Sequence, residues 1–245
     1  MKYVRTLDEG IFLKRYKRFF ADIEWQGQIL TAHVANTGSL KGVNQPGQPC
    51  MFSHTENPAR KLRQSLEAIK STSGCWVGVN TATPNAVVRE ALERIVQAVT
   101  GEKFHPNWSH WKGFDFVKPE FKISAETRLD FVLGKAGSPQ KHFIEVKNVT
   151  LADGDVAMFP DAETTRGQKH LLELMKLVEE GHTAEILFTI QRNDCEHFAP
   201  AHLIDREYGR LLKLALEKGV RITPLVVEIS PQEVVLGGRA LSLKL

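Results

Sequence analysis

A change in hydrophobic pattern near residue 80 divides the chain into two parts with different expected folds. Before it, apolar residues come in short runs at 11–16, 19–25 and 29–35, separated by glycine, proline and other turn-forming residues. This spacing predicts a small β-barrel or β-sandwich. After residue 80, strand-like runs alternate with segments of helical period, which predicts a mixed sheet with flanking helices. The sequence therefore favours an α/β (α+β) protein of two domains.

The second part begins with a helix. Thr83 and Pro84 are a typical start, an N-cap followed by the favoured first helical residue. Apolar residues then repeat with helical period up to Val99, and Gly101 supplies a stop. The later strands are expected at 128–133, 142–151, 184–190 and about 220–229, and the later helices at about 164–180 and 206–218.

Composition and charge exclude several classes of protein. With 42% hydrophobic and 25% charged residues the chain can form a real core, so disorder is not expected. No apolar run approaches the roughly 20 residues that cross a bilayer, and charges throughout the N-terminus exclude a signal peptide. The three cysteines are widely spaced and odd in number, which argues against a disulfide framework. We expect a cytoplasmic protein with no membrane partner.

The histidines suggest no metal site. His33, His110 and His197 are among nine histidines, and none of these three takes part in an HxxxH or HxH motif. Without such spacing we assign the histidines no metal.

Three charged residues lie on two strands that are otherwise largely apolar. Strand alternation places Glu145 and Lys147 on one face of the strand at 142–151, and Asp130 lies on the preceding strand. Charged groups are costly to bury unless they are paired or bound to a metal. The alternative is a surface strand with a Glu–Lys ion pair, which is common and weakly stabilising.

A metal-dependent phosphodiesterase would use all three residues. Mg²⁺ or Mn²⁺ takes oxygen ligands, so Asp130 and Glu145 would hold the ion, with the Val146 carbonyl and Glu90 of the first helix as further ligands. The ion would lower the pKa of a bound water and neutralise charge on the phosphate. Lys147 would orient the water or stabilise the developing oxyanion.

The helix start within FPDAETTRGQKHLLELM, at 159–175, is unusually polar. The free N–H groups and dipole of a helix N-terminus attract phosphate. Helical spacing aligns Gln168 with Leu171 and Met175, so Gln168 is expected to point toward Glu145 and is assigned to the catalytic group. The expected contacts to nucleic acid here are Arg166, Lys169 and His170. The alternative is a capped helix start with solvated cations.

Cations and aromatic rings are interleaved in KRYKRFF, at 14–20. Residues 1–72 carry 11 Lys+Arg against 6 Asp+Glu, whereas the rest of the chain carries 21 against 23. Cations that contact phosphates and rings that stack on bases suit a nucleic-acid surface. If this segment is a strand, Arg15, Lys17 and Phe19 share one face. The expected contacts are Arg15, Lys17, Arg18, Asn36, Thr37 and, in a second basic cluster, Arg63. The alternative is that the rings are core and the cations are simply solvated.

Taken together, these segments resemble the sugar fermentation stimulation protein (SfsA) family over nearly the whole chain. The motifs are KRYKRFFAD at 14–22, NTGSL at 36–40, VNTATPN at 79–85, RLDFVL at 128–133, IEVKNVTL at 144–151, FPDAETTRGQKHLLEL at 159–174 and FAPAHLID at 198–205. The segment at 159–174 is highly specific, whereas Glu-x-Lys is not. Leu40 departs from the pattern, since many members have methionine there.

The resemblance implies an N-terminal OB-fold-like β-barrel at 1–80 and a PD-(D/E)XK nuclease-like domain at 81–245. It also implies sequence-nonspecific DNA binding, linked in bacteria to the regulation of sugar, especially maltose, utilisation. The nuclease-type residues of the family correspond to Asp130, Glu145 and Lys147, with Glu90 as a further member.

Three hypotheses for the function stay open at this point. The first is metal-dependent phosphodiester hydrolysis on DNA or another nucleic acid, which the intact Asp–Glu–Lys set favours. The second is a noncatalytic DNA-binding regulator of sugar utilisation that retains a nuclease fold. The third is a cleft that acts on a small phosphorylated or nucleotide ligand. The oligomeric state is also open, a homodimer included.

Overall fold

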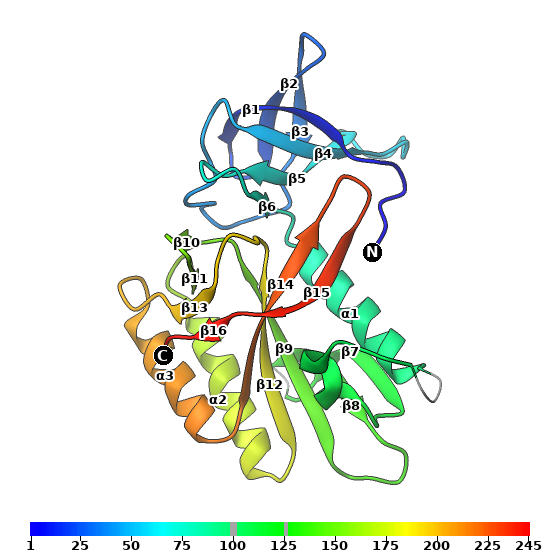
Figure 1. Ribbon diagram of the computed structural model, residues 1–245, viewed down its shortest axis with the longest axis vertical. Helices are drawn as coiled ribbons and strands as arrows, with labels where there is room; N and C mark the ends of the chain where they lie inside the picture. The colour runs from blue at the N-terminus through cyan, green and yellow to red at the C-terminus, as the bar shows by residue number, and fades with distance from the viewer. Residues whose placement is uncertain (99–101, 125–126) are drawn as a thin grey trace.

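The computed structural model describes residues 1–98, 102–124 and 127–245 and contains a β-barrel followed by a mixed α/β domain (Figure 1). The α+β class with an N-terminal barrel is therefore confirmed. The last barrel-side strand, β6, ends at Gly78, and helix α1 begins at Thr83. Within the described part of the chain, no helix is long and apolar enough to cross a membrane.

Five strands close the N-terminal barrel. Strands β1, β2 and β3 form an antiparallel meander, β4 pairs with both β1 and β5, and a parallel β3–β5 contact closes the ring. The strands are β1 (Asp8–Tyr16), β2 (Phe20–Trp25), β3 (Gln28–His33), β4 (Pro49–His54) and β5 (Gln64–Lys70), with β6 (Trp76–Gly78) added beside β5. Inward-facing Phe12, Ile23, Phe52 and Leu66 fill the interior and exclude water from it.

A six-stranded mixed sheet forms the centre of the second domain. Its order is β15-β14-β12-β9-β8-β7, with β9, β12 and β14 parallel and the other neighbours antiparallel. The strands are β7 (Phe116–Lys122), β8 (Arg128–Gly134), β9 (Lys141–Val149), β12 (Thr183–Ile190), β14 (Arg221–Ile229) and β15 (Val234–Ala240). A small second sheet contains β10 (Ala152–Asp153), β11 (Val156–Phe159), β13 (His197–Pro200) and β16 (Ser242–Leu243).

Helices cover both faces of the large sheet. On one face α2 (Thr165–Glu179) and α3 (Arg206–Glu217) pack against alternate residues of β9 and β12 such as Phe143 and Ile186. On the other face α1 (Thr83–Val96) and the short 3-10 helix η1 (Pro106–Trp111) pack against Ile144 and Leu187. Strand alternation in β9 therefore separates two cores, one on each side of the sheet.

The helix starts agree with the sequence, with one shift. Thr164 caps α2 by accepting the N–H of Gly167, and Asp205 caps α3 by accepting the N–H of Tyr208. Thr83, expected as the cap of α1, is instead its first helical residue, because Ala82 occupies the N-cap position. The expected stop of this helix, Val99 to Gly101, lies outside the described residues, and α1 ends at Val96.

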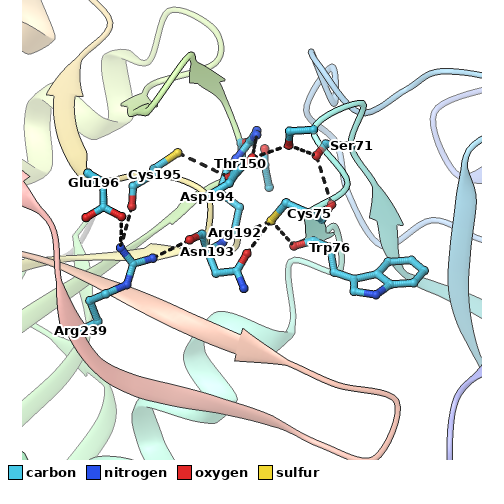
Figure 2. A network of polar contacts seen from close by, with 11 residues as sticks. Ser71, Cys75, Trp76, Thr150, Arg192, Asn193, Asp194, Cys195, Glu196 and Arg239 are labelled. Atoms are coloured by element: carbon cyan, nitrogen blue, oxygen red, sulfur yellow. Dashed lines mark hydrogen bonds and ion pairs between the residues drawn. The ribbon is translucent and has the colours of Figure 1, made fainter.

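A polar network joins the barrel to the second domain (Figure 2). The Arg192 guanidinium donates two hydrogen bonds of 2.7 Å to the carboxylate of Asp194, which also accepts the hydroxyl of Ser73 at 2.6 Å. The thiol of Cys75 donates to the side-chain oxygen of Asn193 at 3.0 Å. Because Ser73 and Cys75 belong to the barrel side, their hydrogen bonds to Asp194 and Asn193 connect the two domains, and the ion pair with Arg192 holds Asp194 in place within the second domain.

Replacing Asp194 with Asn is expected to destabilise the protein. The hydrogen bonds and charge of Arg192 hold the pKa of Asp194 well below its usual range, so this stabilisation is present at neutral pH, begins to fall below about pH 4 and is lost as the pH falls through the much lower folded-state pKa. We expect Asp194→Asn to lower the free energy of unfolding by about 2 kcal/mol at pH 7 because Arg192 loses its charge partner. Denaturant unfolding at pH 7 and pH 3.5 measures the difference.

The control for this variant is Asp153→Asn, which removes an exposed carboxylate elsewhere on the same domain. It should leave the stability within about 0.5 kcal/mol at both pH values. Equal stability of Asp194→Asn and the parent at pH 7 would contradict the role given to the ion pair.

Candidate active site

The candidate site lies where strands β8 and β9 part. Their ladder ends at the pair Phe131 and Ile144. At the next position, Asp130 turns its carboxylate into the gap and accepts the backbone N–H of Val146 at 2.8 Å. Its other oxygen accepts the side-chain amide of Asn85, from the start of α1, at 2.7 Å. A carboxylate thus bridges the opening in the sheet and is fixed from two sides.

Glu145 is the next acidic group, and it lies on β9 beside Asp130. Its side chain is 5% exposed, and its Oε1 accepts the Lys147 ammonium at 2.6 Å. The same oxygen also forms a short contact with Nδ1 of His170, which comes from α2. The other oxygen, Oε2, is buried without a hydrogen-bond partner among the described residues. A buried carboxylate oxygen with no partner is costly, so Oε2 is poised for a ligand.

The two carboxylates have different pKa values because their surroundings differ. Burial and the negative charge of Glu145 raise the pKa of Asp130 to about 6. Burial also acts to raise the pKa of Glu145, but the hydrogen bond from His170 and the charge of Lys147 outweigh it and lower the pKa. Near neutral pH both groups are ionised, and they repel each other unless a cation lies between them.

A pocket of about 300 Å³ opens over these side chains. Its lining includes Asn85, Asp130, Glu145, Lys147, Asn148, Thr164 and Arg166. Thr164 is the N-cap of α2, so the positive end of that helix dipole lies at the edge of the pocket. The pocket therefore combines two carboxylates on its floor with a lysine, an arginine and a helix N-terminus, which suits a cation and a phosphate bound together.

Two residues expected at this site, Gln168 in the catalytic group and Glu90 as a metal ligand, lie elsewhere. The Gln168 side chain points to α3, where its amide donates to the Asp205 carboxylate at 3.0 and 3.1 Å. Gln168 lies in line with Leu171, as expected, but this side of α2 also borders α3. The side-chain amide of Gln168 is therefore bound by the carboxylate that caps α3. Glu90 is exposed on α1 and pairs with the N-terminal amine of Met1 at 2.6 Å. The residue that α1 brings to Asp130 is Asn85.

The polar start of α2 divides between the pocket and solvent. Arg166 is exposed and lines the pocket, with its Nε 3.5 Å from Nε2 of His170. Lys169 is also exposed, one residue before His170, and does not line the pocket. His170, expected as a contact to nucleic acid, is buried against Glu145 instead. Its place in line with Leu174 and Leu177 is the sequence signal for an inward-facing position.

Arg15, expected as a nucleic-acid contact, has its guanidinium engaged by the barrel itself. It donates to the backbone carbonyls of Asn36 at 2.6 Å, Gly38 at 2.7 Å and Arg18 at 2.8 Å. These bonds tie the β1–β2 turn to the loop that follows β3. Arg15 therefore holds in place the backbone segments that form the basic surface. Its own positive charge contributes to that surface from inside the barrel.

Lys17 and Arg18 occupy the turn between β1 and β2. Both have positive φ angles, 47° and 63°, which places them in a tight turn rather than in a strand. The expected strand alternation of Arg15, Lys17 and Phe19 therefore does not apply, because the strand ends at Tyr16. Both turn cations are exposed and, with Arg15 and Thr37, they line a pocket of about 400 Å³.

The remaining expected contacts on the barrel differ in position. Asn36 is buried, and its side chain donates to the carbonyl of Val79 and accepts the N–H of Gly38, so it orders the loop. Thr37 is exposed at the pocket of the β1–β2 turn. Arg63 is exposed just before β5 and lines neither this pocket nor that of Glu145.

A short segment connects the pocket at the β1–β2 turn with the pocket over Asp130 and Glu145. Thr81 lines the carboxylate pocket, and its N–H and hydroxyl both donate to the carbonyl of Ala35, at 2.9 and 2.7 Å. Ala35 precedes Asn36, whose carbonyl accepts a hydrogen bond from Arg15. Gly38 packs closely against Asp161 in the segment before α2. The two pockets are therefore held next to each other by backbone contacts.

The donor set of the carboxylate pocket fits a hard divalent cation. Glu145 Oε2 and Asn148 Oδ1 are both buried without hydrogen-bond partners among the described residues, and both residues line the pocket beside Asp130. Oxygen ligands of this kind are those that Mg²⁺, Mn²⁺ and Ca²⁺ prefer. A divalent ion would satisfy the buried oxygens and relieve the repulsion between the two carboxylates.

Comparison with known proteins gives one family over both domains. Residues 13–79 match the family described as the SfsA N-terminal OB domain, and residues 82–233 match the sugar fermentation stimulation protein RE domain. A sugar fermentation stimulation protein homolog of Bdellovibrio bacteriovorus is 62% identical over 248 residues and covers 100% of both chains. A homolog of Geotalea uraniireducens is 44% identical over 93% of each chain.

A solved structure supports the same assignment. The structure of Pyrococcus furiosus SfsA in complex with Ca²⁺ matches 100% of this chain and 98% of its own, with a TM-score of 0.82 and 27% sequence identity. The expected resemblance is thereby confirmed. This chain belongs to the sugar fermentation stimulation protein family.

Proposed function

We propose that this protein is a metal-dependent nuclease that binds DNA without sequence preference and hydrolyses its phosphodiester bonds. The observation that carries the proposal is the pair of carboxylates, Asp130 and Glu145, on the floor of a pocket that also holds Lys147. Oε2 of Glu145 has no hydrogen-bond partner among the described residues, and the pKa of Asp130 is raised, and both features support the binding of a cation. The set of Asp130, Glu145 and Lys147 supports a site of the PD-(D/E)XK nuclease kind, with the second domain as its proposed scaffold.

The cation would be Mg²⁺ or Mn²⁺, held by Asp130, Glu145 and the carbonyl of Val146. When bound, it would supply an acidified water and neutralise charge on the phosphate. The relative from Pyrococcus furiosus was solved in complex with Ca²⁺, and Ca²⁺ uses the same class of oxygen ligands. For this chain we use Ca²⁺ as a noncatalytic probe of the site.

Four further side chains in or beside the pocket would have distinct tasks. Lys147, whose ammonium is 2.6 Å from Glu145, would orient the attacking water and then stabilise the developing oxyanion. His170 contacts Oε1 of Glu145 from α2 and so would leave Oε2 available to the ion. Arg166 and the N-terminus of α2 would bind the phosphate. Asn85 positions Asp130.

The barrel would hold the DNA and deliver it to the pocket. Lys17 and Arg18 present their cations at one pocket, and the contact of Thr81 with Ala35 connects that pocket with the carboxylates. A backbone that follows this line passes from cations on the barrel to cations at α2. Such a track binds phosphates without reading bases, which agrees with DNA binding that is independent of sequence.

One observation favours a second function. Lys147 and His170 both contact Oε1 of Glu145, so part of the site is satisfied without a metal. A noncatalytic DNA-binding regulator of sugar (maltose) utilisation could retain this fold and the basic track. It would bind DNA and leave it uncleaved.

The buried free thiols of Cys50, Cys75 and Cys195 suit a reducing compartment, and we assign the protein to the cytoplasm under either function.

The raised pKa of Asp130 predicts a pH-dependent stability in the absence of metal. The protonated carboxyl favours the folded state fully below about pH 4, and this contribution is lost as the pH rises through about 6. In EDTA at pH 7.5, Asp130→Asn should therefore be more stable than the parent by about 1–2 kcal/mol, with no difference at pH 4. Calorimetric melting at both pH values measures this.

Ca²⁺ should reverse that order. An ion that binds only the folded parent stabilises it by about 2.7 kcal/mol at 100 times its Kd, whereas Asp130→Asn should gain little. A matched control is Asp153→Asn, which changes an exposed carboxylate and should follow the parent throughout. Parallel pH profiles of Asp130→Asn and the parent in EDTA would show that the site carries no strained carboxylate.

Metal binding and DNA cleavage should be lost separately in two variants. Glu145→Gln should abolish calorimetric binding of Mg²⁺ and Mn²⁺ together with cleavage of labelled DNA. Lys147→Met should retain metal binding within about tenfold but lower the cleavage rate by at least about 10²-fold, because a stabilising cation is missing. Glu90→Gln is the matched control, since Glu90 lies outside the pocket, and it should cleave like the parent.

The outcomes distinguish the candidate functions. Cleavage by Glu145→Gln at the rate of the parent would identify a contaminating nuclease and refute the proposal. Metal binding and DNA binding without cleavage by the parent would favour the regulator. Strong inhibition of metal-dependent hydrolysis by a nucleotide, with poor competition by long DNA, would favour a small phosphorylated ligand.

Removing the turn cations should weaken DNA binding without affecting the metal site. In Lys17→Ala/Arg18→Ala, the affinity for DNA in Ca²⁺ should fall at least tenfold. The slope of log affinity against log salt should also become shallower, by about 0.9 for each lost phosphate contact with duplex DNA. Fluorescence anisotropy over a range of salt concentrations measures both.

Lys213→Ala, an exposed change on α3, is the control and should bind DNA like the parent. An unchanged salt slope in the double variant would exclude the β1–β2 turn from the DNA track.

A further inference from the structure

Three side chains from separate segments meet on the face of the large sheet opposite Glu145. His110 comes from η1, His142 from β9 and Glu185 from β12. Nε2 of His110 is 3.1 Å from both oxygens of Glu185, and Nε2 of His142 is 3.0 Å from one of them. The three ligating atoms lie within 4.8 Å of one another. This cluster has no part in the carboxylate pocket.

Glu185 is a carboxylate in a fully buried position. Its side chain is 0% exposed, yet it accepts hydrogen bonds from the indole N–H of Trp111 at 2.7 Å and from the hydroxyl of Thr223. These two donors are neutral, so they stabilise the carboxylate by hydrogen bonding but leave its negative charge without a positive partner. The two imidazoles are its other partners, and the compensating positive charge must come from them or from an ion that they help to hold.

The hydrogen bonds around His142 determine which of its nitrogens carries a proton. The hydroxyl of Thr183 donates to the carbonyl of Lys141 at 3.3 Å, so its oxygen is left to accept from Nδ1 of His142 at 2.9 Å. A neutral imidazole protonated on Nδ1 presents the lone pair of Nε2 to Glu185. Two lone pairs that face each other at 3.0 Å repel unless a positive charge lies between them.

A metal ion would supply this positive charge, and the geometry of the cluster is compatible with one. The fixed Nδ1–H is the outer contact that metal-binding histidines usually make. With bonds of about 2.0–2.1 Å to a tetrahedral Zn²⁺, neighbouring ligand atoms lie about 3.3 Å apart, close to the separations of 3.0 and 3.1 Å found here. A pocket of about 550 Å³, lined in part by His110, His142 and Arg221, provides access.

We propose that His110, His142 and Glu185 form a binding site for a first-row transition metal ion, with Zn²⁺ as the ion that fits best. Two imidazoles and one carboxylate supply three ligands, and the pocket leaves the fourth position to water or to an anionic ligand near Arg221. Through these three ligands the ion links η1 to strands β9 and β12. The site is separate from the Mg²⁺ site of the proposed nuclease and does not depend on it.

The sequence pattern concealed this site. His110, His142 and Glu185 are 32 and 43 residues apart, so no short spacing such as HxxxH marks them. The proposal differs from the expectation from the sequence, which assigned no metal to His110. The three ligands become neighbours only because β9 and β12 pair in parallel, with His142 opposite Thr183, and η1 packs at the end of both.

The test is Zn²⁺ titration of untagged, EDTA-treated protein against a chromophoric chelator, in a Glu145→Gln background that removes the carboxylate pocket as a competitor. We expect one Zn²⁺ per chain with micromolar or tighter affinity. His110→Ala should weaken the affinity at least about 100-fold, because one of three protein ligands is lost. His110 is the most exposed of the three, at 15%, so this variant is the mildest to the fold.

His197→Ala is the matched control, since this histidine lies on β13 outside the cluster, and it should bind Zn²⁺ like the background protein. X-ray absorption of the Zn²⁺-loaded background protein gives a second readout that needs no change at the cluster. It should report two imidazole ligands at about 2.0–2.1 Å. Absence of saturable binding, unchanged affinity in His110→Ala, or a spectrum with fewer than two imidazoles would each overturn the proposal and leave protonated histidines as the counter-charge of Glu185.

Discussion

The hydrogen bond between the Val146 N–H and the Asp130 carboxylate, where β8 and β9 separate, is the contact on which the candidate active site depends. It continues the connection between two strands after their backbone pairing has ended at Phe131 and Ile144. It also brings Asp130 next to Glu145, although each carboxylate raises the electrostatic cost of the other. The fold thus holds two carboxylates together in the pocket although they repel each other. Such electrostatically unfavourable arrangements concentrate at functional sites.

Other elements of the protein hold these two carboxylates in position. Helix α1 supplies Asn85 to Asp130, and helix α2 supplies His170 to Glu145, so the two layers of helices each hold one carboxylate. The barrel reaches the same pocket through the contact of Thr81 with Ala35, and the hydroxyl of Ser73 on the barrel side donates to Asp194 of the second domain. Under the proposed function, a nucleic acid that crosses from one domain to the other would meet a rigid path, which would limit the conformational cost of binding.

Much of this fold was predictable, because its patterns are local. The strands at 128–133, 142–151 and 184–190 and the helices after Thr164 and Asp205 follow from alternation, helical period and capping. Glu145 and Lys147 could be paired because they lie two residues apart on one strand. Gln168 and Glu90 were expected at the pocket but lie elsewhere. Helical period shows which residues share one side of a helix, but not which neighbouring element that side contacts. Asn85 and the His110–His142–Glu185 cluster depend on contacts between distant segments, which no short spacing encodes.

The most direct test of the account is the position of a bound metal. Crystals of the parent soaked in Mn²⁺ should show an anomalous peak in the carboxylate pocket, about 2.0–2.6 Å from Glu145 Oε2 and from an oxygen of Asp130. The Lys147 ammonium should then turn from Glu145 toward the ion-bound water. A pocket without Mn²⁺ at millimolar concentration, with Lys147 still paired to Glu145, would contradict the central claim that these carboxylates form a metal site.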